Sequence, residues 1–222
     1  LAVTSIFEDS AAVGIDGDGA DNSALDAGAV YVFAQGDAGW TQQAYVKASN
    51  TESSDQFGYS VALSGDGNTL AVGANLEASS ATGVNGDQDD NSVLGAGAVY
   101  VFIRDGATWS QQAYVKASNA EAGDVFGYQV GLSFDGNTLT VAAQGEDSAA
   151  SGVNFDEINN DAGGAGAAYV FARNGANWTQ QAYLKASNPE ENDLFGSSIA
   201  ISDDGDTIVV GALDEDGGQP GV

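Results

Sequence analysis

The side chains that could do chemistry in this 222-residue chain are almost all carboxylates. The sequence contains 32 Asp and Glu residues against 5 Lys and Arg residues, which gives a formal net charge of −27. Hard cations such as Ca²⁺ take six to eight oxygen ligands, supplied mainly by carboxylates and carbonyl groups. Cation binding is therefore the first chemistry that the composition suggests.

The acidic residues gather in a segment that recurs three times, where Asp and Asn are interspersed with Gly. This pattern lets side chains and backbone carbonyls converge on a cation, although the same residues also suit solvated turns on an acidic surface. A Glu recurs ahead of each segment, at positions 8, 77 and 146, and again at 215. The predicted Ca²⁺ ligands are Asp16, Asp18, Asp21, Asn22, Asn85, Asp87, Asp89, Asp90, Asn91, Asn154, Asp156, Asn159, Asn160 and Asp161.

Cys and His are both absent from the sequence, and their absence excludes much catalytic chemistry. Without Cys there is no thiolate nucleophile and no thiolate metal site, and without His there is no imidazole base. Paired carboxylates could serve a glycosidase, but among 32 acids such pairs arise by chance on exposed loops, so we do not predict an enzyme. The negative charge also argues against nucleic acid or an anionic membrane as a partner, and no apolar run is long enough for membrane insertion.

The acidic segments belong to a tandem repeat of 69 residues. The segment Gln-Gln-Ala-Tyr begins at Gln42, Gln111 and Gln180, and residues 1–69 are identical to residues 70–138 at about 43 of 69 positions. A period of this size indicates a repeat architecture in which each unit buries its faces against its neighbours.

Each period contains four short apolar runs separated by turn residues. In the middle copy these runs are approximately Phe57–Ser64, Thr69–Ala74, Ala96–Arg104 and Trp109–Ala117. The first run alternates large and small residues, which is typical of a strand with two different faces, and no window shows a helical period. Four strands, two tight turns and one long loop predict a unit of the size of a propeller blade.

The repeat resembles the FG-GAP repeat, the blade of the integrin alpha-subunit head and of many secreted bacterial proteins. The resemblance lies in Phe57-Gly58, Phe126-Gly127 and Phe195-Gly196, each with an Asp two positions before the Phe, and in the later Ala-Gly-Ala-Val-Tyr-Val-Phe segment. It implies β-propeller blades, an extracellular location, calcium in some blades, and binding or adhesion rather than catalysis. The sequence departs from the family because the Pro of its name is missing and the turn Ser64–Thr69 is shorter than the family's calcium loop.

The predicted fold class is all-β, with tandem four-stranded antiparallel blades and about 3.25 blades in the chain. The predicted units are a partial blade at residues 1–56 (strands 2 to 4), full blades at 57–125 and 126–194, and a partial blade at 195–222 (strands 1 and 2). Such a set of blades forms part of a larger ring, completes a ring by association, or extends a linear array.

Two further residue types recur once in each period. Lys47, Lys116 and Lys185 lie on the Tyr-bearing face of the fourth strand, where we expect an ion pair with a nearby acid; the alternative is a self-formed amide crosslink to Asn or Asp. The Trp residues at 40, 109 and 178 begin that strand, where each is expected to cover the neighbouring blade. The alternative for the Trp residues is a stacking platform for a ligand such as a sugar.

Together these features predict a non-enzymatic, extracellular or cell-surface repeat module with a structural or adhesive role. Its expected partners are copies of itself or adjacent repeats, with an extracellular protein or glycan as a further partner and Ca²⁺ as a stabilising ion. The alternative function is a ligand-binding propeller of the lectin type.

Overall fold

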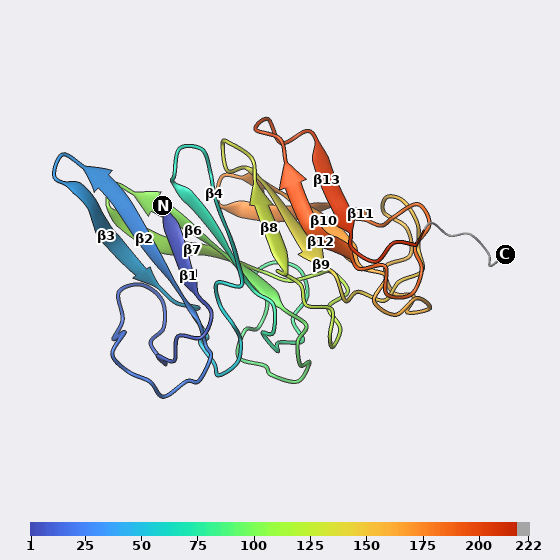
Figure 1. Cartoon of the computed structure of the whole chain (residues 1–222), viewed down its shortest axis with the longest axis horizontal. Helices are drawn as coiled ribbons and strands as arrows, with labels where there is room; N and C mark the ends of the chain where they lie inside the picture. The colour runs from blue at the N-terminus through green and yellow to red at the C-terminus, as the bar shows by residue number, and fades with distance from the viewer. Residues whose placement is uncertain (217–222) are drawn as a thin grey trace.

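The computed structural model describes residues 1–216, which form thirteen strands in four antiparallel sheets (Figure 1). No helix occurs among these residues, and hence none that is long and apolar enough to span a bilayer. Each complete sheet is a four-stranded meander repeated in tandem, so the predicted all-β fold class with propeller-type blades is confirmed.

The four sheets follow the order of the chain. The first contains β1 (Ala2–Ser5), β2 (Ala29–Gly36) and β3 (Gly39–Val46). The second contains β4 (Ser60–Leu63), β5 (Thr69–Ala74), β6 (Ala98–Asp105) and β7 (Thr108–Val115). The third contains β8 (Gln129–Leu132), β9 (Thr138–Ala143), β10 (Ala167–Asn174) and β11 (Asn177–Leu184), and the last pairs β12 (Phe195–Ile201) with β13 (Ile208–Ala212).

The first strand of the middle blade is shorter than the sequence predicted. It begins at Ser60 rather than at Phe57, because Gly58 has a φ of +94° and Tyr59 donates its N–H to Gln56 in a turn. The N–H of Phe57 is hydrogen-bonded to Ala27 in the preceding unit. The Phe-Gly pair therefore joins two units instead of continuing a strand.

The sheets stack on one another through two apolar cores. One core lies between the first and second sheets and includes Val30 and Val46 of the first, with Phe57, Tyr100 and Phe102 of the second unit. The other core repeats this arrangement between the second and third sheets. Each core therefore contains side chains from two successive blades, as expected for repeats that cover each other's faces.

Close backbone approach between units depends on glycine. Gly97 has a φ of +79°, and a Cβ at this position would lie 2.1 Å from the carbonyl oxygen of Phe126 in the next unit. The isolated bridge between Gly97 and Phe126 fixes the point where the two units meet. Gly28 and Gly166 make the same contact with Phe57 and Phe195.

The hairpin of the last two strands in each blade contains a β-bulge. In the second sheet Val101 pairs with Ala113 and Phe102 pairs with Gln111, so Gln112 is left as the extra residue. The same irregularity leaves Gln43 and Gln181 unpaired in the first and third sheets. A bulge re-aims the side chain of the extra residue, and here that side chain belongs to Gln.

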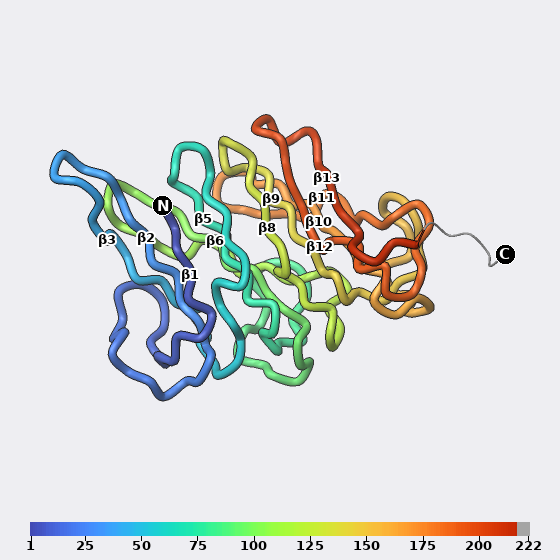
Figure 2. Tube along the Cα trace, in the orientation of Figure 1, coloured from blue at the N-terminus to red at the C-terminus, as the bar shows by residue number. Residues whose placement is uncertain are grey.

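The sheets succeed one another along the long axis of the molecule (Figure 2). The long loops that follow β1 and β5 run along the lower edge in this view, and the β4–β5 and β8–β9 turns lie along the upper edge (Figure 1). The predicted unit boundaries stay predictions, and residues 217–222 of the fourth unit lie outside the described residues.

Candidate functional site

The most elaborate polar site lies between consecutive blades, and it is built around a buried lysine. Lys116 follows β7, two residues after Tyr114, so both side chains lie on the same face. Both reach Glu77 in the loop after β5: Lys116 Nζ lies 2.8 Å from Oε2, and the Tyr114 hydroxyl donates to Oε1 at 2.8 Å. The predicted ion pair is therefore confirmed, with side-chain exposures of 0% for Lys116 and 1% for Glu77.

The preceding blade supplies a third side chain to the same carboxylate. Asn50, in the segment after β3, donates its Nδ2 to Glu77 Oε1 at 3.2 Å and to the carbonyl of Gln88 at 2.8 Å. The hydroxyl of Tyr100 donates to Asn50 Oδ1 at 2.5 Å. We call Asn50, Glu77, Tyr100, Tyr114 and Lys116 the first junction.

A second junction repeats the first one 69 residues later. Lys185 and Tyr183 contact Glu146 at 2.8 Å each, and Asn119 Nδ2 lies 3.0 Å from Glu146 Oε1. The hydroxyl of Tyr169 donates to Asn119 Oδ1 at 2.7 Å. The identity of the two arrangements shows that the junction is a property of the repeat.

The outer units contain parts of the junction. Lys47 pairs with Glu8 at 2.8 Å, and within residues 1–216 no Asn side chain is hydrogen-bonded to Glu8. Asn188 donates to Glu215 at 2.9 Å in the last unit. The recurring Glu of the acidic segments is thus a partner of Lys or Asn in the folded chain.

Burial shifts the pKa values of several groups in and around the junctions. It lowers the pKa of Lys116 and Lys185, since their neighbouring carboxylates only partly offset the loss of hydration. It raises the pKa of Tyr100 and Tyr169 far above the ordinary value. Asp55 lies close by, and burial together with the charge of Glu77 raises its pKa to about 7.

The bulged glutamines make a second contact between blades, which we call the Gln–Trp clamp. Gln43 Oε1 accepts hydrogen bonds from Trp109 Nε1 at 3.0 Å and from Arg104 at 3.3 Å, while the Arg104 guanidinium lies 5.7 Å from the centre of the Trp109 ring system. Gln112 makes the same contacts with Trp178 and Arg173. The prediction that the Trp residues cover the neighbouring blade is confirmed for Trp109 and Trp178, which are each 4% exposed and contact the Gln of the preceding blade, and is wrong for Trp40, which is exposed.

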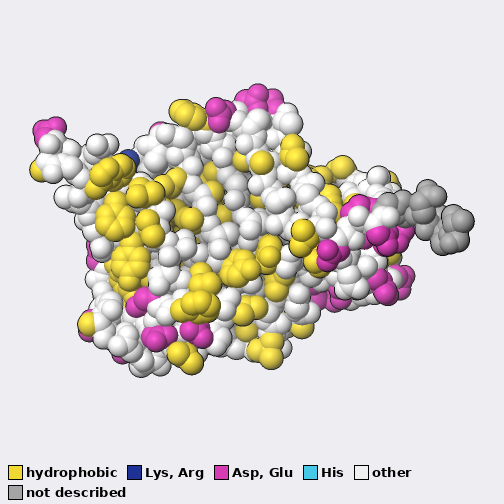
Figure 3. All heavy atoms as spheres, in the orientation of Figure 1, with side chains coloured by type: hydrophobic (Ala, Val, Ile, Leu, Met, Phe, Trp, Pro, Cys, Tyr) yellow, Lys and Arg dark blue, Asp and Glu magenta, His cyan; other side chains and the backbone are white. Residues whose placement is uncertain are grey.

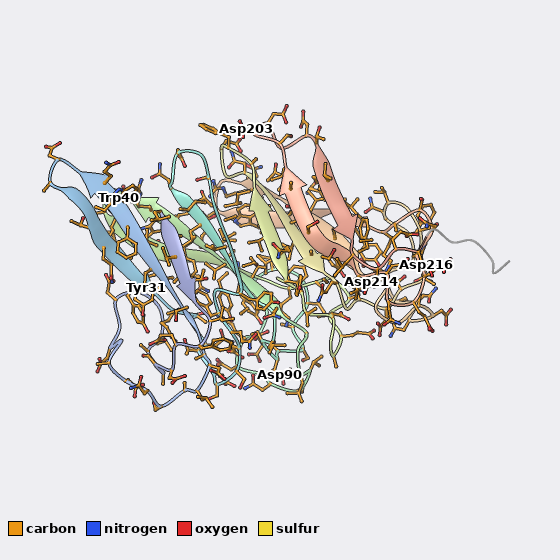
Figure 4. The ribbon with its side chains drawn as sticks, in the orientation of Figure 1. Tyr31, Trp40, Asp90, Asp203, Asp214 and Asp216 are labelled. Atoms are coloured by element: carbon orange, nitrogen blue, oxygen red, sulfur yellow. The ribbon has the colours of Figure 1, made fainter. Side chains whose placement is uncertain are left out.

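The first unit presents its Trp to solvent. Trp40 is 57% exposed, and position 35 holds Gln where the other blades have Arg104 and Arg173. Figure 4 shows Trp40 and Tyr31 on the first sheet, and Figure 3 shows hydrophobic side chains gathered over the same end of the molecule. Trp40 also lines a hollow of about 280 Å³, together with Gln35, Arg104 and Trp109.

The predicted calcium residues lie in the long loops, where many of them make hydrogen bonds that hold the loop itself. Asp16, Asn85 and Asn154 have a φ near +56°, and their side-chain oxygens accept the N–H of Tyr45, Tyr114 and Tyr183 respectively. They attach each loop to the last strand of its blade. Figure 4 shows Asp90 within the loops of the lower edge.

The other predicted ligands make mostly local contacts. The carboxylates of Asp18, Asp87 and Asp156 each accept the backbone N–H of the residue two positions later. The backbone carbonyl of each of these residues accepts a hydrogen bond from a Ser hydroxyl. The carboxylates of Asp21 and Asp90 each accept a backbone N–H from across the loop and a hydrogen bond from a Ser hydroxyl. Asn159 accepts the N–H of Asp161, and the amides of Asn91 and Asn160 bond Glu52 and Glu121 of the preceding unit. The backbone of Asn22 also hydrogen-bonds to the Asp21 carboxylate, whereas within residues 1–216 the carboxylate of Asp89 accepts none of these hydrogen bonds.

The carboxylate and amide oxygens of the loops are suitable ligands for a hard cation, but their side chains are not arranged as a preformed coordination site. In the part of the chain that the structure describes, no group of three or more acidic side chains converges on one point. A Ca²⁺ ion in these loops stays a prediction, and it requires carboxylates such as Asp87 and Asp90 to exchange backbone donors for the ion.

Sequence reasoning missed the residues that join the blades. Asn50, Asn119 and Asn188 recur in an Ala-Ser-Asn segment, so the repeat did mark them, but nothing in the pattern placed them beside the Glu of the next unit. Gln43 and Gln112 were hidden because regular alternation does not reveal a bulge. For the Lys–Glu pairs, the sequence showed only that Lys and Glu each recur every 69 residues.

Comparison with known families gives a match that covers most of the chain. The model described as FG-GAP repeat matches residues 40–102, 109–171 and 178–221. Each matched segment begins at the Trp of one blade and runs into the next unit, so the first two segments contain the Asn and the Glu of a junction, while the Lys of that junction lies beyond the segment's end. No curated protein matches the chain.

Proposed function

This chain belongs to the FG-GAP repeat family, and on that premise we propose that it is a non-enzymatic, extracellular repeat module with a structural or adhesive role, whose blades associate end to end. The observation that supports this proposal is the Gln–Trp clamp. It joins the first blade to the second and the second to the third with the same residues. A contact that repeats by translation along the chain can also be made with a further repeat.

The two halves of the clamp are both present on the outside of the described structure. Trp40 is exposed on the first unit, and among residues 1–216 the side chain of Gln181, on the last full blade, is hydrogen-bonded only to Thr179 of its own strand. Trp40 and Gln181 would complete the clamp if two repeat arrays met head to tail. A heterologous contact of this kind gives a ring when it closes and a fibre when it does not.

Light scattering on the purified chain tests the association. The chain should form species larger than its 22.3 kDa monomer, and Trp40→Ala should shift the population toward the monomer. The matched control is Phe155→Ser, which removes another exposed aromatic residue from a loop outside the clamp. A monodisperse monomer at all concentrations would contradict the proposal.

A second candidate function, glycan binding, is favoured by the environment of Trp40. An exposed indole beside a hollow with Gln35 and Arg104 offers a stacking face and polar groups, which suit a sugar ring. Trp109 and Trp178 are buried, so this candidate is confined to the first unit. Tryptophan fluorescence titrated with neutral and acidic oligosaccharides should change for the native chain and not for Trp40→Ala.

A further inference from the structure

Each junction brings an amine and a primary amide to one buried carboxylate. Lys116 Nζ and Asn50 Nδ2 are hydrogen-bonded to the two oxygens of Glu77, at 2.8 and 3.2 Å. The two oxygens share one carbon, so a proton accepted from Lys116 can be passed to Asn50 by the same group. A carboxylate placed between a nucleophile and a leaving group has the geometry of a general acid–base catalyst.

The amide of Asn50 is also activated at its carbonyl oxygen. Asn50 Oδ1 accepts a hydrogen bond of 2.5 Å from the Tyr100 hydroxyl. Burial keeps this hydroxyl protonated, because it raises the pKa of Tyr100 far above its ordinary value. A fixed donor at this oxygen stabilises the negative charge that develops there when a nucleophile attacks the carbonyl carbon.

The nucleophile is a lysine side chain that has lost its contact with water. Lys116 is fully buried and Lys185 has a side-chain exposure of 1%. Burial lowers the pKa of both amines, so proton transfer to the paired carboxylate leaves a neutral and reactive amine. A desolvated lysine of this kind can act as a nucleophile when a neighbouring group takes its proton.

We propose that Lys116 forms an isopeptide bond with Asn50, and Lys185 with Asn119, so that covalent crosslinks join the first blade to the second and the second to the third. The proposal is independent of end-to-end association and of the ligand. It assigns Glu77 and Glu146 as the general acid–base groups, with Tyr100 and Tyr169 as the oxyanion donors.

The reaction is balanced without any further reagent. Glu77 takes a proton from Lys116 Nζ, and the lone pair of Nζ then attacks Asn50 Cγ while Oδ1 takes the negative charge. Glu77 gives its proton to Nδ2, the Cγ–Nδ2 bond breaks as Oδ1 re-forms the carbonyl, and ammonia departs. The second proton lost by Nζ leaves with the ammonia as an ammonium ion, so Glu77 returns to its carboxylate form and the new amide nitrogen keeps one hydrogen.

The first unit provides an internal comparison. Lys47 and Glu8 form the same ion pair, but within the described residues no Asn reaches this carboxylate. Lys47 should therefore keep a free amine, whereas Lys116 and Lys185 should be consumed.

Trypsin makes this difference visible, because an amide-linked lysine is not cleaved. The chain contains only Lys47, Arg104, Lys116, Arg173 and Lys185 as tryptic sites. The crosslinked chain, once denatured, should yield the peptide 1–47 and one branched product in which 48–104, 105–173 and 174–222 are joined. The intact mass should be lower than that of the sequence by two molecules of ammonia.

The opposite result is equally clear. A full intact mass together with the linear peptides 105–116 and 174–185 would overturn the proposal. Succinimide formation at an Asn also expels ammonia, but it leaves Lys116 open to trypsin, so a mass deficit with linear peptides would overturn it as well.

Variants assign the roles of the residues. Asn50→Ala keeps the Lys116–Glu77 pair and should remove one crosslink, so that the mass deficit falls to one ammonia and trypsin cleaves at Lys116. Glu77→Gln should abolish the same bond while the Lys185–Asn119 bond persists, and Glu8→Gln is the matched control in which both bonds form. A native mass deficit that is unchanged in Asn50→Ala would refute the assignment, and the mass of the native chain tests the proposal even if a variant fails to fold.

Discussion

Asp55 shows at the scale of one residue how the polar sites between blades respond to pH. Asp55 is 5% exposed and its carboxylate accepts the N–H of Glu52 at 3.1 Å, and burial with the charge of Glu77 raises its pKa from 3.8 to about 7. In the unfolded chain the same group titrates near 3.8. Asp124 in the next unit has the same raised pKa, of about 7, chiefly through burial.

We predict that Asp55 destabilises the fold as the pH rises from about 4 to 7. The folded state holds its proton over this range and the unfolded state does not, so the free energy of unfolding falls with increasing pH. Asp55→Asn stays neutral and can still accept the Glu52 N–H, so the variant should gain stability relative to the native chain at pH 8 more than at pH 5. Urea denaturation at the two pH values measures this difference.

The control for this prediction is Asp66, whose titration has the opposite sign. Hydrogen bonds from Ser64 and Asn68 lower its pKa, so its contribution to stability is present above pH 3.8 and is lost as the pH falls below that value. Asp66→Asn should therefore cost the same stability at pH 5 and pH 8. An Asp55→Asn effect that is also constant between these pH values would show that Asp55 does not hold a proton in the folded state.

At the scale of the element, strands and turns followed from the sequence while the contacts between blades did not. Alternation and turn residues predicted the strand at 69–74 with its bounds and the others to within a few residues. The bulge at Gln112 and the positive φ of Gly97 depend on the neighbouring blade, and periodicity within one strand carries no signal of that neighbour. An ion pair of Lys116 with some acid was predicted, because lysine recurs once in each period of an acidic chain. The contact of Asn50 with Glu77 could not be predicted, because it forms only when two sheets stack.

Gln112 gives a test of the clamp with a control on the same element. Gln112→Ala removes the acceptor of Trp178 Nε1 and of Arg173, so it should cost about 1–3 kcal/mol, because a donor that was satisfied is left without its partner. Gln181→Ala changes the equivalent bulge where no Trp is bonded to it, and should cost less than about 0.5 kcal/mol. Equal costs in chemical denaturation would show that the clamp does not stabilise the stack.

Gly97 tests the close approach of the blades. Gly97→Ala forces an L-residue to a φ of +79° and places its Cβ 2.1 Å from the Phe126 carbonyl oxygen, so the blades must separate. Gly106→Ala has a φ of +62° but no atom within 4 Å, so it should cost only the backbone strain of about 1–2 kcal/mol. Thermal denaturation should show a considerably larger loss for Gly97→Ala, and similar losses would contradict the packing at the Gly97–Phe126 bridge.

In the whole molecule, the negative charge favours separation of the blades, and the contacts between blades oppose it. A net charge of −27 on 222 residues destabilises the compact state by self-repulsion, and the long acidic loops of the first two units lie along the same edge of the molecule (Figure 1). The stack resists this repulsion through two apolar cores and the junctions between blades. A crosslinked array would retain its blade order even when one blade opens, which suits a module that carries load or stays exposed outside the cell.

The last prediction concerns Ca²⁺ and the long loops that hold the fourteen predicted ligands. Because a divalent ion that binds the folded state better than the unfolded one stabilises the fold, Ca²⁺ at about ten times its dissociation constant should add about 1.4 kcal/mol, which is about 3–6 °C in melting temperature for a chain of this size. Melts in CaCl₂ must be compared with melts in NaCl of matched ionic strength, since salt screening alone also relieves the repulsion. The double variant Asp87→Asn with Asp90→Asn should reduce the gain, whereas Asp203→Asn, on a turn at the opposite edge in Figure 4, should leave it unchanged. Identical melts in the two salts would contradict Ca²⁺ binding and would show that the loops are held by their own backbone and serine hydrogen bonds.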